Sequence, residues 1–179
     1  MPDRPTANIE VKVRCRDLGA ARERAVRIAD ARLGLDRQVD TYFRTAAGRL
    51  KLRESSLSGS QLIPYLRPDE AGPRRSDYRV IPVDDGLGLR DLLGRILGIQ
   101  RVVRKEREIL LVENVRIHLD RVEGLGDFVE FEAVLPPGEI SAAVEERERT
   151  KVRRLMEALG VAEEDVVPTS YEALLEAGR

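Results

Sequence analysis

Acidic and basic side chains recur at every second position along several segments of this sequence. Glu130 and Glu132, for example, alternate with Val129, Phe131 and Ala133. Because alternate residues of a β-strand point to the same face, such segments carry charge on one face and apolar side chains on the other. The basic residues placed in this way include Lys12, Lys51, Arg53, Arg67, Arg79, Lys105 and Arg107. The acidic residues are Glu10, Asp120, Glu130 and Glu132.

For any one of these segments, the simplest interpretation is a polar strand face in contact with water. The joint pattern favours a different one, because helices would cover the apolar faces and the charged faces would then meet inside. Burying such charges is costly unless each is paired or meets a counter-ion. An interior of many cations beside a carboxylate cluster suits a polyanion bridged by a divalent metal. Lysine and arginine would hold phosphate oxygens, and the carboxylates would hold Mg²⁺ or Mn²⁺.

The elements that must position these residues are strands joined mostly by short hairpin turns, which favours antiparallel pairing. The predicted strands are 7–16, 38–44, 49–54, 61–67, 77–82, 99–112, 115–122 and 128–135. The sequence therefore predicts an α+β fold, an eight-stranded antiparallel β tunnel or barrel with a charged interior and helices packed outside. We expect residues 1–179 to form it as a single domain.

Four helices are predicted around the strands, and two of them carry explicit packing expectations. The first runs from an Asp17 cap to about Leu33 and is closed by Gly34, with an apolar stripe of Leu18, Ala21, Ala25 and Ile28. The second, Leu87–Leu97, is expected to bury Leu89, Leu92, Leu93 and Ile96. The other two lie in 139–159 and 166–177.

Composition narrows the class of protein. The net charge of −1, from 31 basic and 32 acidic residues, argues against a general nucleic-acid-binding surface. No apolar run has the length of a membrane helix, and the N-terminus has no signal-peptide core, so we expect a cytoplasmic protein without a membrane partner. The single cysteine, Cys15, excludes an internal disulfide and a CxxC metal site.

Several short motifs occur in an order that resembles the CYTH superfamily, or triphosphate tunnel metalloenzymes, which includes class IV adenylate cyclases and thiamine triphosphatases. The motifs are NIEVK (8–12), DTYF (40–43), GRLKLRE (48–54), YLRPD (65–69), SDYR (76–79), VRKERE (103–108), RIHLDRVEGLGDFVEFE (116–132) and SYEALL (170–175). The resemblance covers nearly the whole chain and implies an eight-stranded tunnel that binds a triphosphate along its axis.

The resemblance also implies roles for individual residues. Glu10, Asp120, Glu130 and Glu132 correspond to catalytic metal ligands for Mg²⁺ or Mn²⁺, with Asp120 alternatively positioning a water. The phosphate ligands are Lys12, Lys51, Arg53, Arg79, Lys105 and Arg107, with Arg67 as an addition. The chain departs from the family signature E-x-E-x-K at its first acid, which is Asn8 here. An amide oxygen can ligate a metal but brings no charge, so this change predicts weaker metal binding.

These features together predict an enzyme that binds a triphosphate in a cationic tunnel and hydrolyses it to release phosphate, with tripolyphosphate, thiamine triphosphate or ATP as the substrate. A cyclase that converts ATP to cyclic AMP and pyrophosphate is the first alternative. The second, suggested by Asn8, is a non-catalytic triphosphate-binding module. A single-stranded RNA binder fits poorly because the chain has no Trp and few other aromatic residues for base stacking. One or two metals, and a monomer or a homodimer, are all compatible with the sequence.

Overall fold

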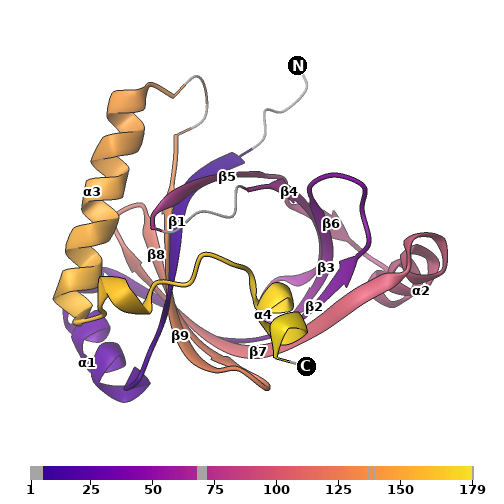
Figure 1. The fold of residues 1–179 in the computed structure, drawn as a ribbon, viewed down its shortest axis with the longest axis horizontal. Helices are drawn as coiled ribbons and strands as arrows, with labels where there is room; N and C mark the ends of the chain where they lie inside the picture. The colour runs from indigo at the N-terminus through magenta and orange to yellow at the C-terminus, as the bar shows by residue number, and fades with distance from the viewer. Residues whose placement is uncertain (1–5, 68–71, 137, 139, 179) are drawn as a thin grey trace.

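Eight antiparallel strands form a closed barrel in the computed structural model, which describes residues 6–67, 72–136, 138 and 140–178 (Figure 1). The barrel strands are β1 (Thr6–Arg14), β2 (Ala31–Phe43), β3 (Arg49–Ser55), β4 (Gly59–Leu66), β5 (Arg74–Tyr78), β7 (Ile99–Val112), β8 (Val115–Val122) and β9 (Gly126–Val134). Their order is β3-β2-β7-β8-β9-β1-β5-β4, and β4 pairs back to β3 to close the ring. The short strand β6 (Ile81–Val83) pairs with β4 outside the ring. The predicted α+β barrel is confirmed.

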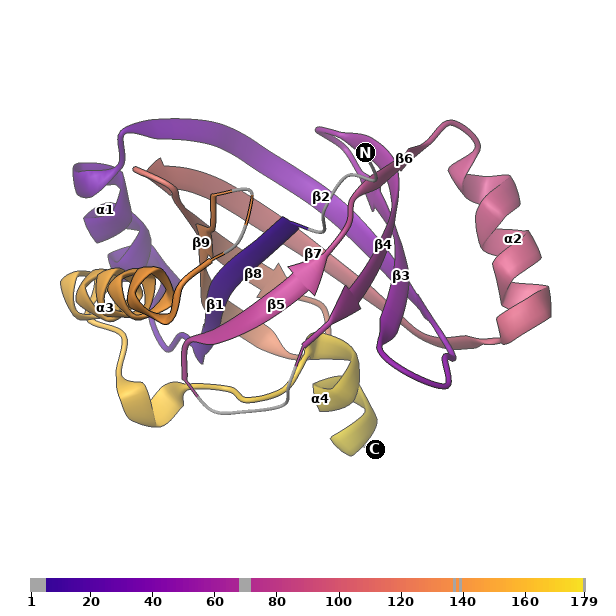
Figure 2. The same ribbon diagram turned by 90° about the horizontal axis from the view of Figure 1, so that it is seen from above.

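Apolar side chains on the outside of β1, β8 and β9 form the main core. Ile9, Val11 and Val13 alternate along β1 and are fully buried. They lie in one cluster with residues of α1 (Leu18–Ile28) and α3 (Ala142–Leu159). Figures 1 and 2 show both helices on the same side of the barrel wall. With helices on the outer face, the alternating charged residues of β1 and β9 are left to face the barrel interior.

The C-terminal helix α4 (Tyr171–Ala177) lies at one end of the barrel. Figure 1 looks along the barrel and shows α4 in front of its opening, and Figure 2 shows the same helix below the strands. The short 3₁₀ helix η1 (Glu163–Asp165) precedes it. Val167 N donates to Lys12 O at 2.8 Å, which ties the connecting segment to β1. This attachment brings Tyr171 toward the inward-facing side chains of the barrel.

The first predicted helix was too long. α1 ends at Ile28, and β2 already begins at Ala31 because the segment pairs with β7 along almost its whole length. Asp30 N donates to Leu111 O at 2.8 Å, which starts this pairing. Gly34 does not close the helix: it lies within β2 at a register shift, with φ of 108°. Long-range sheet pairing therefore overrides the local helix pattern, and Ile28 is left 39% exposed.

The burial expected for the second helix is also partly wrong. α2 (Gly86–Leu97) lies apart from the other helices, on the opposite side of the barrel (Figure 2). Leu89 and Leu93 are half-buried, whereas Leu92 and Ile96 are 53% and 66% exposed. The helix packs against β2, β3 and β7 with one side only, so a single stripe of its apolar residues is covered.

The predicted strand 77–82 is two elements, β5 and β6, with a break between them at Arg79 and Val80. Gly98 and Gly160 end α2 and α3 with positive φ, as glycine at a helix C-terminus commonly does. Within the described ranges, none of the helices is long and apolar enough to span a membrane.

Candidate functional site

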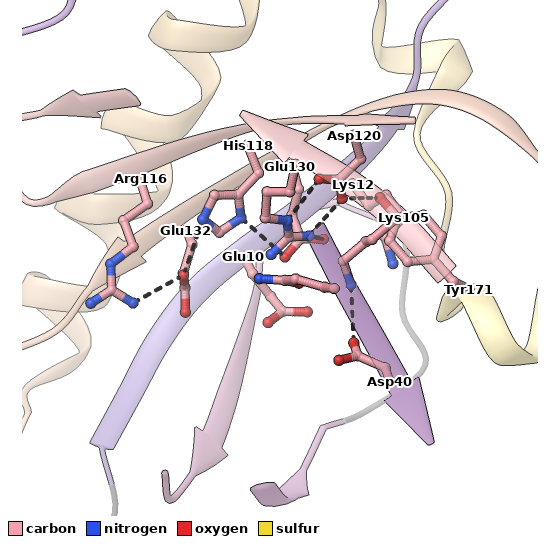
Figure 3. Close-up of polar contacts among 12 residues, drawn as sticks. Glu10, Lys12, Asp40, Lys105, Arg116, His118, Asp120, Glu130, Glu132 and Tyr171 are labelled. Carbon is pink, nitrogen blue, oxygen red and sulfur yellow. Dashed lines mark hydrogen bonds and ion pairs between the residues drawn. The ribbon is translucent and has the colours of Figure 1, made fainter. Parts of the chain in front are cut away.

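A cavity of about 640 Å³ lies inside the barrel and is lined by charged side chains from most of its strands. Its volume falls within the range of about 300–1,000 Å³ that is usual for small-molecule sites. The structure brings together here nine of the residues predicted from the sequence. They are Glu10, Lys12, Lys51, Arg53, Arg67, Lys105, Arg107, Glu130 and Glu132. Figure 3 shows how several of them point toward one another from different strands.

Asp40 of β2 is the shared counter-ion of three of these cations. Its carboxylate accepts from Lys51 Nζ at 3.1 Å and from Lys105 Nζ at 3.0 Å. Arg53 donates to both carboxylate oxygens, at 2.7 and 2.8 Å. The Asp40 side chain is fully buried, and the charges of Arg53, Lys105 and Lys51 outweigh that burial and hold its pKa well below the usual range. One negative charge therefore serves three positive ones.

Arg107 of β7 is held in the same way by two acids. Its Nε and Nη2 donate to the two carboxylate oxygens of Asp120 at 2.7 and 2.6 Å, and Nη2 lies 3.3 Å from Glu130. Tyr171 of α4 donates its hydroxyl to Asp120 at 2.7 Å. The same ring lies under Lys12, whose Nζ is 3.8 Å from the ring centroid. Asp120 thus stands behind Arg107 and orients it, rather than lining the cavity itself.

Glu132 and Glu10 occupy the other side of the cavity. Glu132 accepts from Asn8 Nδ2 and from Arg116 Nη1, the latter at 3.3 Å, and Glu10 accepts from Arg67 Nη1. His118 lies between the two acids of β9, with Nδ1 3.7 Å from Glu130 and Nε2 3.9 Å from Glu132. Burial and the charge of Arg107 lower the pKa of His118, which favours the neutral imidazole at neutral pH.

Two lysines of the cavity have strongly shifted pKa values. Desolvation lowers the pKa of Lys105 to about 7, with further lowering by Arg107, Arg53 and Lys51 that Asp40 only partly offsets. Desolvation lowers the pKa of Lys12 to about 8. The opposite holds for Glu130, where burial alone would raise the pKa but Arg107, His118 and Lys12 keep it well below its usual range. Burial therefore disfavours the protonated forms of Lys105 and Lys12, and a negatively charged ligand in the cavity would stabilise these forms.

The acids of the cavity fit a hard divalent cation in their donor chemistry. Glu10 and Glu132 are directly opposite in the β1–β9 pairing, and Glu130 lies two residues from Glu132 on the same face. The buried Oδ1 of Asn8 accepts no hydrogen bond within the described part of the chain. Carboxylate and amide oxygens are the ligands that Mg²⁺ prefers. In the structure these glutamates form ion pairs with arginines of the protein. Among the described residues, no three Asp, Glu, His or Cys side chains lie close enough together to hold a metal ion.

Besides Asp120, which lies behind Arg107, Arg79 is a predicted site residue that does not line the cavity. It is exposed in the break between β5 and β6, because the inward face of β5 is Ser76 and Tyr78 rather than Asp77. The buried arginine of this strand is Arg74, directly opposite Glu10 in the β1–β5 pairing.

Asp40, Tyr171 and Gln38 are among the residues of the site that were not assigned a role from the sequence. Strand periodicity places Asp40 on the same face of β2 as Tyr42, which lines the cavity, but it does not reveal the role of Asp40 as a counter-ion. Tyr171 lies in a helix far along the chain, and nothing in its local sequence indicates that it reaches Asp120. Gln38, two residues before Asp40, also faces the cavity.

Comparisons with known proteins agree with this architecture. The family model of the CYTH domain matches residues 6–171. A Methanocaldococcus jannaschii protein named "Putative adenylate cyclase" is 26% identical over 139 residues, which cover 74% of each chain. A solved structure from Pyrococcus horikoshii matches with a TM-score of 0.78 and 26% identity, over 93% of this chain and 98% of that chain. A Hippeastrum structure, described by a dominant triphosphatase activity, has a TM-score of 0.59 and 15% identity, over 97% and 96% of the two chains.

Proposed function

The chain belongs to the CYTH domain family, and from this premise we propose that it is a metal-dependent enzyme that binds a triphosphate inside the barrel and hydrolyses it to release phosphate. Triphosphate tunnel enzymes of this family are generally metal-dependent. The substrate is a linear polyanion, either tripolyphosphate or an organic triphosphate such as thiamine triphosphate or ATP.

The observation that carries this proposal is the sharing of Asp40 by Lys51, Arg53 and Lys105. Three buried cations around one carboxylate leave positive charge that the protein does not neutralise locally. Arg67 adds to this, because its buried Nε and Nη2 have no hydrogen-bond partner among the described residues. Such N–H groups are matched by the oxygens of a phosphate chain.

The chain's own residues would then act mainly by positioning and charge. Lys51, Arg53, Lys105 and Arg107 would align successive phosphate groups and neutralise their charge, which is the main requirement for phosphoryl transfer. Asp40 and Asp120 hold these cations in place before the substrate arrives. Lys12 of β1 and Arg67, which directly follows β4, would contact the phosphate chain from the other side of the cavity.

The acids that would hold the metal are Glu10, Glu130 and Glu132, with Asn8 as a neutral fourth donor. A bound Mg²⁺ or Mn²⁺ would act as a Lewis acid on the phosphoryl group under attack. Each of the three glutamates is paired with an arginine in the structure: Glu10 with Arg67, Glu130 with Arg107 and Glu132 with Arg116. A bound metal would take the place of these arginines as the partner of the carboxylates.

Two other functions have a specific observation in their favour. The name of the M. jannaschii relative supports cyclisation of ATP to cyclic AMP and pyrophosphate in the same cavity. The pairing of every cavity acid with a protein cation or amide, together with the neutral Asn8, supports a module that binds triphosphate without turnover.

The proposal is tested with Glu10→Ala and Glu132→Ala, assayed for phosphate release from tripolyphosphate and ATP in the presence of Mg²⁺ or Mn²⁺. Both variants should lose turnover. The matched control is Glu146→Ala on α3, where the side chain is 64% exposed and far from the barrel interior; it should keep the activity of the parent protein. Unchanged activity in both cavity variants would contradict the assignment, and tight binding without any product would favour the non-catalytic alternative.

A further inference from the structure

We propose that Gln38 makes the cavity selective for a triphosphate whose organic group is a ring with an amino substituent, as in adenine. This inference rests on the proposed function, because the triphosphate must first be held by the barrel cations. In this inference Gln38 binds the organic group of the substrate, and the preferred ligand is an organic triphosphate rather than inorganic tripolyphosphate.

The amide of Gln38 is fixed in one orientation. The side chain is 4% exposed, and Nε2 donates to Asp36 Oδ2 at 2.6 Å. An ionised carboxylate only accepts hydrogen bonds, so the amide nitrogen and not the oxygen must face Asp36. Asp36 is itself held by the hydroxyls of Ser55 and Ser56 and by Leu57 N, at 2.8, 3.1 and 3.2 Å.

The oxygen of the same amide is left without a partner. Gln38 Oε1 is buried and accepts no hydrogen bond within the described residues, although the side chain lines the cavity. The residues that pair with Gln38 on the two neighbouring strands are already engaged, since Ser55 Oγ donates to Asp36 and Lys105 Nζ donates to Asp40. A buried acceptor without a partner is costly, so the site is completed by a ligand donor.

A phosphate chain cannot supply that donor, because its ionised oxygens only accept. A ring amino group can supply it, and the cavity that Gln38 lines also carries apolar side chains that suit a ring. Leu33, Leu57 and Val80 line the same cavity and are 53%, 51% and 46% exposed. Leu57 belongs to the turn that binds Asp36, which places it next to the partner of Gln38. Covering these three side chains with a flat apolar surface would remove them from water.

The second cavity, of about 800 Å³ beside α4, is the competing position for an organic group. An acceptor with spare capacity in this cavity is Glu172, whose Oε1 pairs with Arg49 at 3.3 Å while the buried Oε2 has no hydrogen-bond partner within the described chain. This residue therefore provides a matched comparison for Gln38. The amino group of a ligand could be bound by Gln38 or by Glu172, and variants of these two residues distinguish the two positions.

The experiment compares the binding of ATP, ITP and tripolyphosphate to the full chain by isothermal titration with Mg²⁺ present. ITP carries a ring carbonyl where ATP carries the amino group. The parent protein should prefer ATP over ITP by about tenfold, the value of one hydrogen bond to a buried group. Gln38→Leu should abolish this preference and leave tripolyphosphate binding within about twofold of the parent. Glu172→Gln should keep the preference.

A variant outside the core guards against a folding artefact. Leu57→Ser changes a half-exposed side chain and should weaken ATP and ITP equally without affecting tripolyphosphate. Leu87→Ser, at a 62% exposed position on α2, should change none of the three affinities.

Three results would overturn the inference. Equal affinity of the parent protein for ATP and ITP would contradict the role of Gln38. Binding of tripolyphosphate would in that case still support the proposed function. Loss of the ATP preference in Glu172→Gln rather than in Gln38→Leu would place the ring beside α4. Failure of all three compounds to bind would contradict both the inference and the proposed function.

Discussion

The Oδ2 atom of Asp40 lies 3.0 Å from Nζ of Lys105, and both side chains are closed to solvent. Lys51 and Arg53 share the same carboxylate. Charges buried in this way are stable only while each has a partner. Asp40 therefore acts as the internal counter-ion of these three cations, and the oxygens of a triphosphate would compete with it for them.

Asp40→Asn should lower the free energy of unfolding of the ligand-free protein by about 3–5 kcal/mol, because it leaves three buried cations without their counter-ion. Tripolyphosphate should recover more thermal stability in this variant than in the parent protein. Thermal denaturation with and without tripolyphosphate measures both effects. Asp127→Asn, a change at a partly exposed acid, is the control and should cost little. An unchanged melting temperature in Asp40→Asn would mean that the cations are not paired as described.

Triphosphate affinity should fall as the pH rises from about 6 to about 9, because Lys105, with a pKa of about 7, loses its proton within that window. The protonated lysine is the form that attracts phosphate, so the effect is present below pH 7 and is lost above it. Lys105→Arg keeps its charge across the range and should flatten the profile. Titration calorimetry at several pH values makes the comparison. Parallel profiles for the two proteins would exclude Lys105 as the titrating group.

Tyr171→Phe should cost about 1–3 kcal/mol of stability, because it removes the hydroxyl that donates to the buried Asp120 and keeps the ring. The ring contacts remain in this variant: Lys12 Nζ lies 3.8 Å from the centroid of the Tyr171 ring, and the Phe128 and Tyr171 ring centroids are 5.0 Å apart. Tyr171→Ala loses these as well and should cost about 3–5 kcal/mol, as other large-to-small core changes do. Chemical denaturation distinguishes the two. An equal loss in both variants would mean that the hydroxyl is the only important contact.

Asn8→Glu should make stability depend on divalent metal. In the parent protein Asn8 Nδ2 donates to Glu132, and a carboxylate at this position would instead repel it. The variant should therefore melt below the parent in EDTA and gain more stability from Mg²⁺ or Mn²⁺ than the parent gains. Asn8→Gln, which keeps the amide, is the control. A metal response equal to that of the parent would argue against a metal bound beside Glu132.

Strand periodicity predicts most of this structure because a barrel with helices outside has two distinct faces. The alternation of Ile9, Val11 and Val13 with charged residues follows directly from their burial against α1 and α3. The same rule placed nine of the predicted site residues in one cavity. It failed at Arg79, because Ser76 and Tyr78 form the inward face of β5, so that Arg79 falls on the other face and lies in the break before β6.

Contacts that depend on the closed fold were not accessible from the sequence. The first helix stops early because β2 pairs with β7, starting with Ala31 opposite Leu111, 80 residues further along the chain. Tyr171 meets Asp120 only because the last helix returns to one end of the barrel (Figure 1). The position of Asp40 could be predicted from its alternation with Tyr42, but its three cation partners come from β3 and β7 and require the barrel to be closed.

The central claim is that the barrel binds a triphosphate and turns it over with a divalent metal. The most direct measurement is a turnover panel on the purified chain with tripolyphosphate, thiamine triphosphate and ATP, each with Mg²⁺ and Mn²⁺, in which phosphate, pyrophosphate and cyclic AMP are quantified. We expect metal-dependent release of phosphate that is lost in Glu132→Ala. Cyclic AMP and pyrophosphate from ATP would identify a cyclase instead. No product from any substrate would contradict the account, even if tripolyphosphate stabilised the protein against heat.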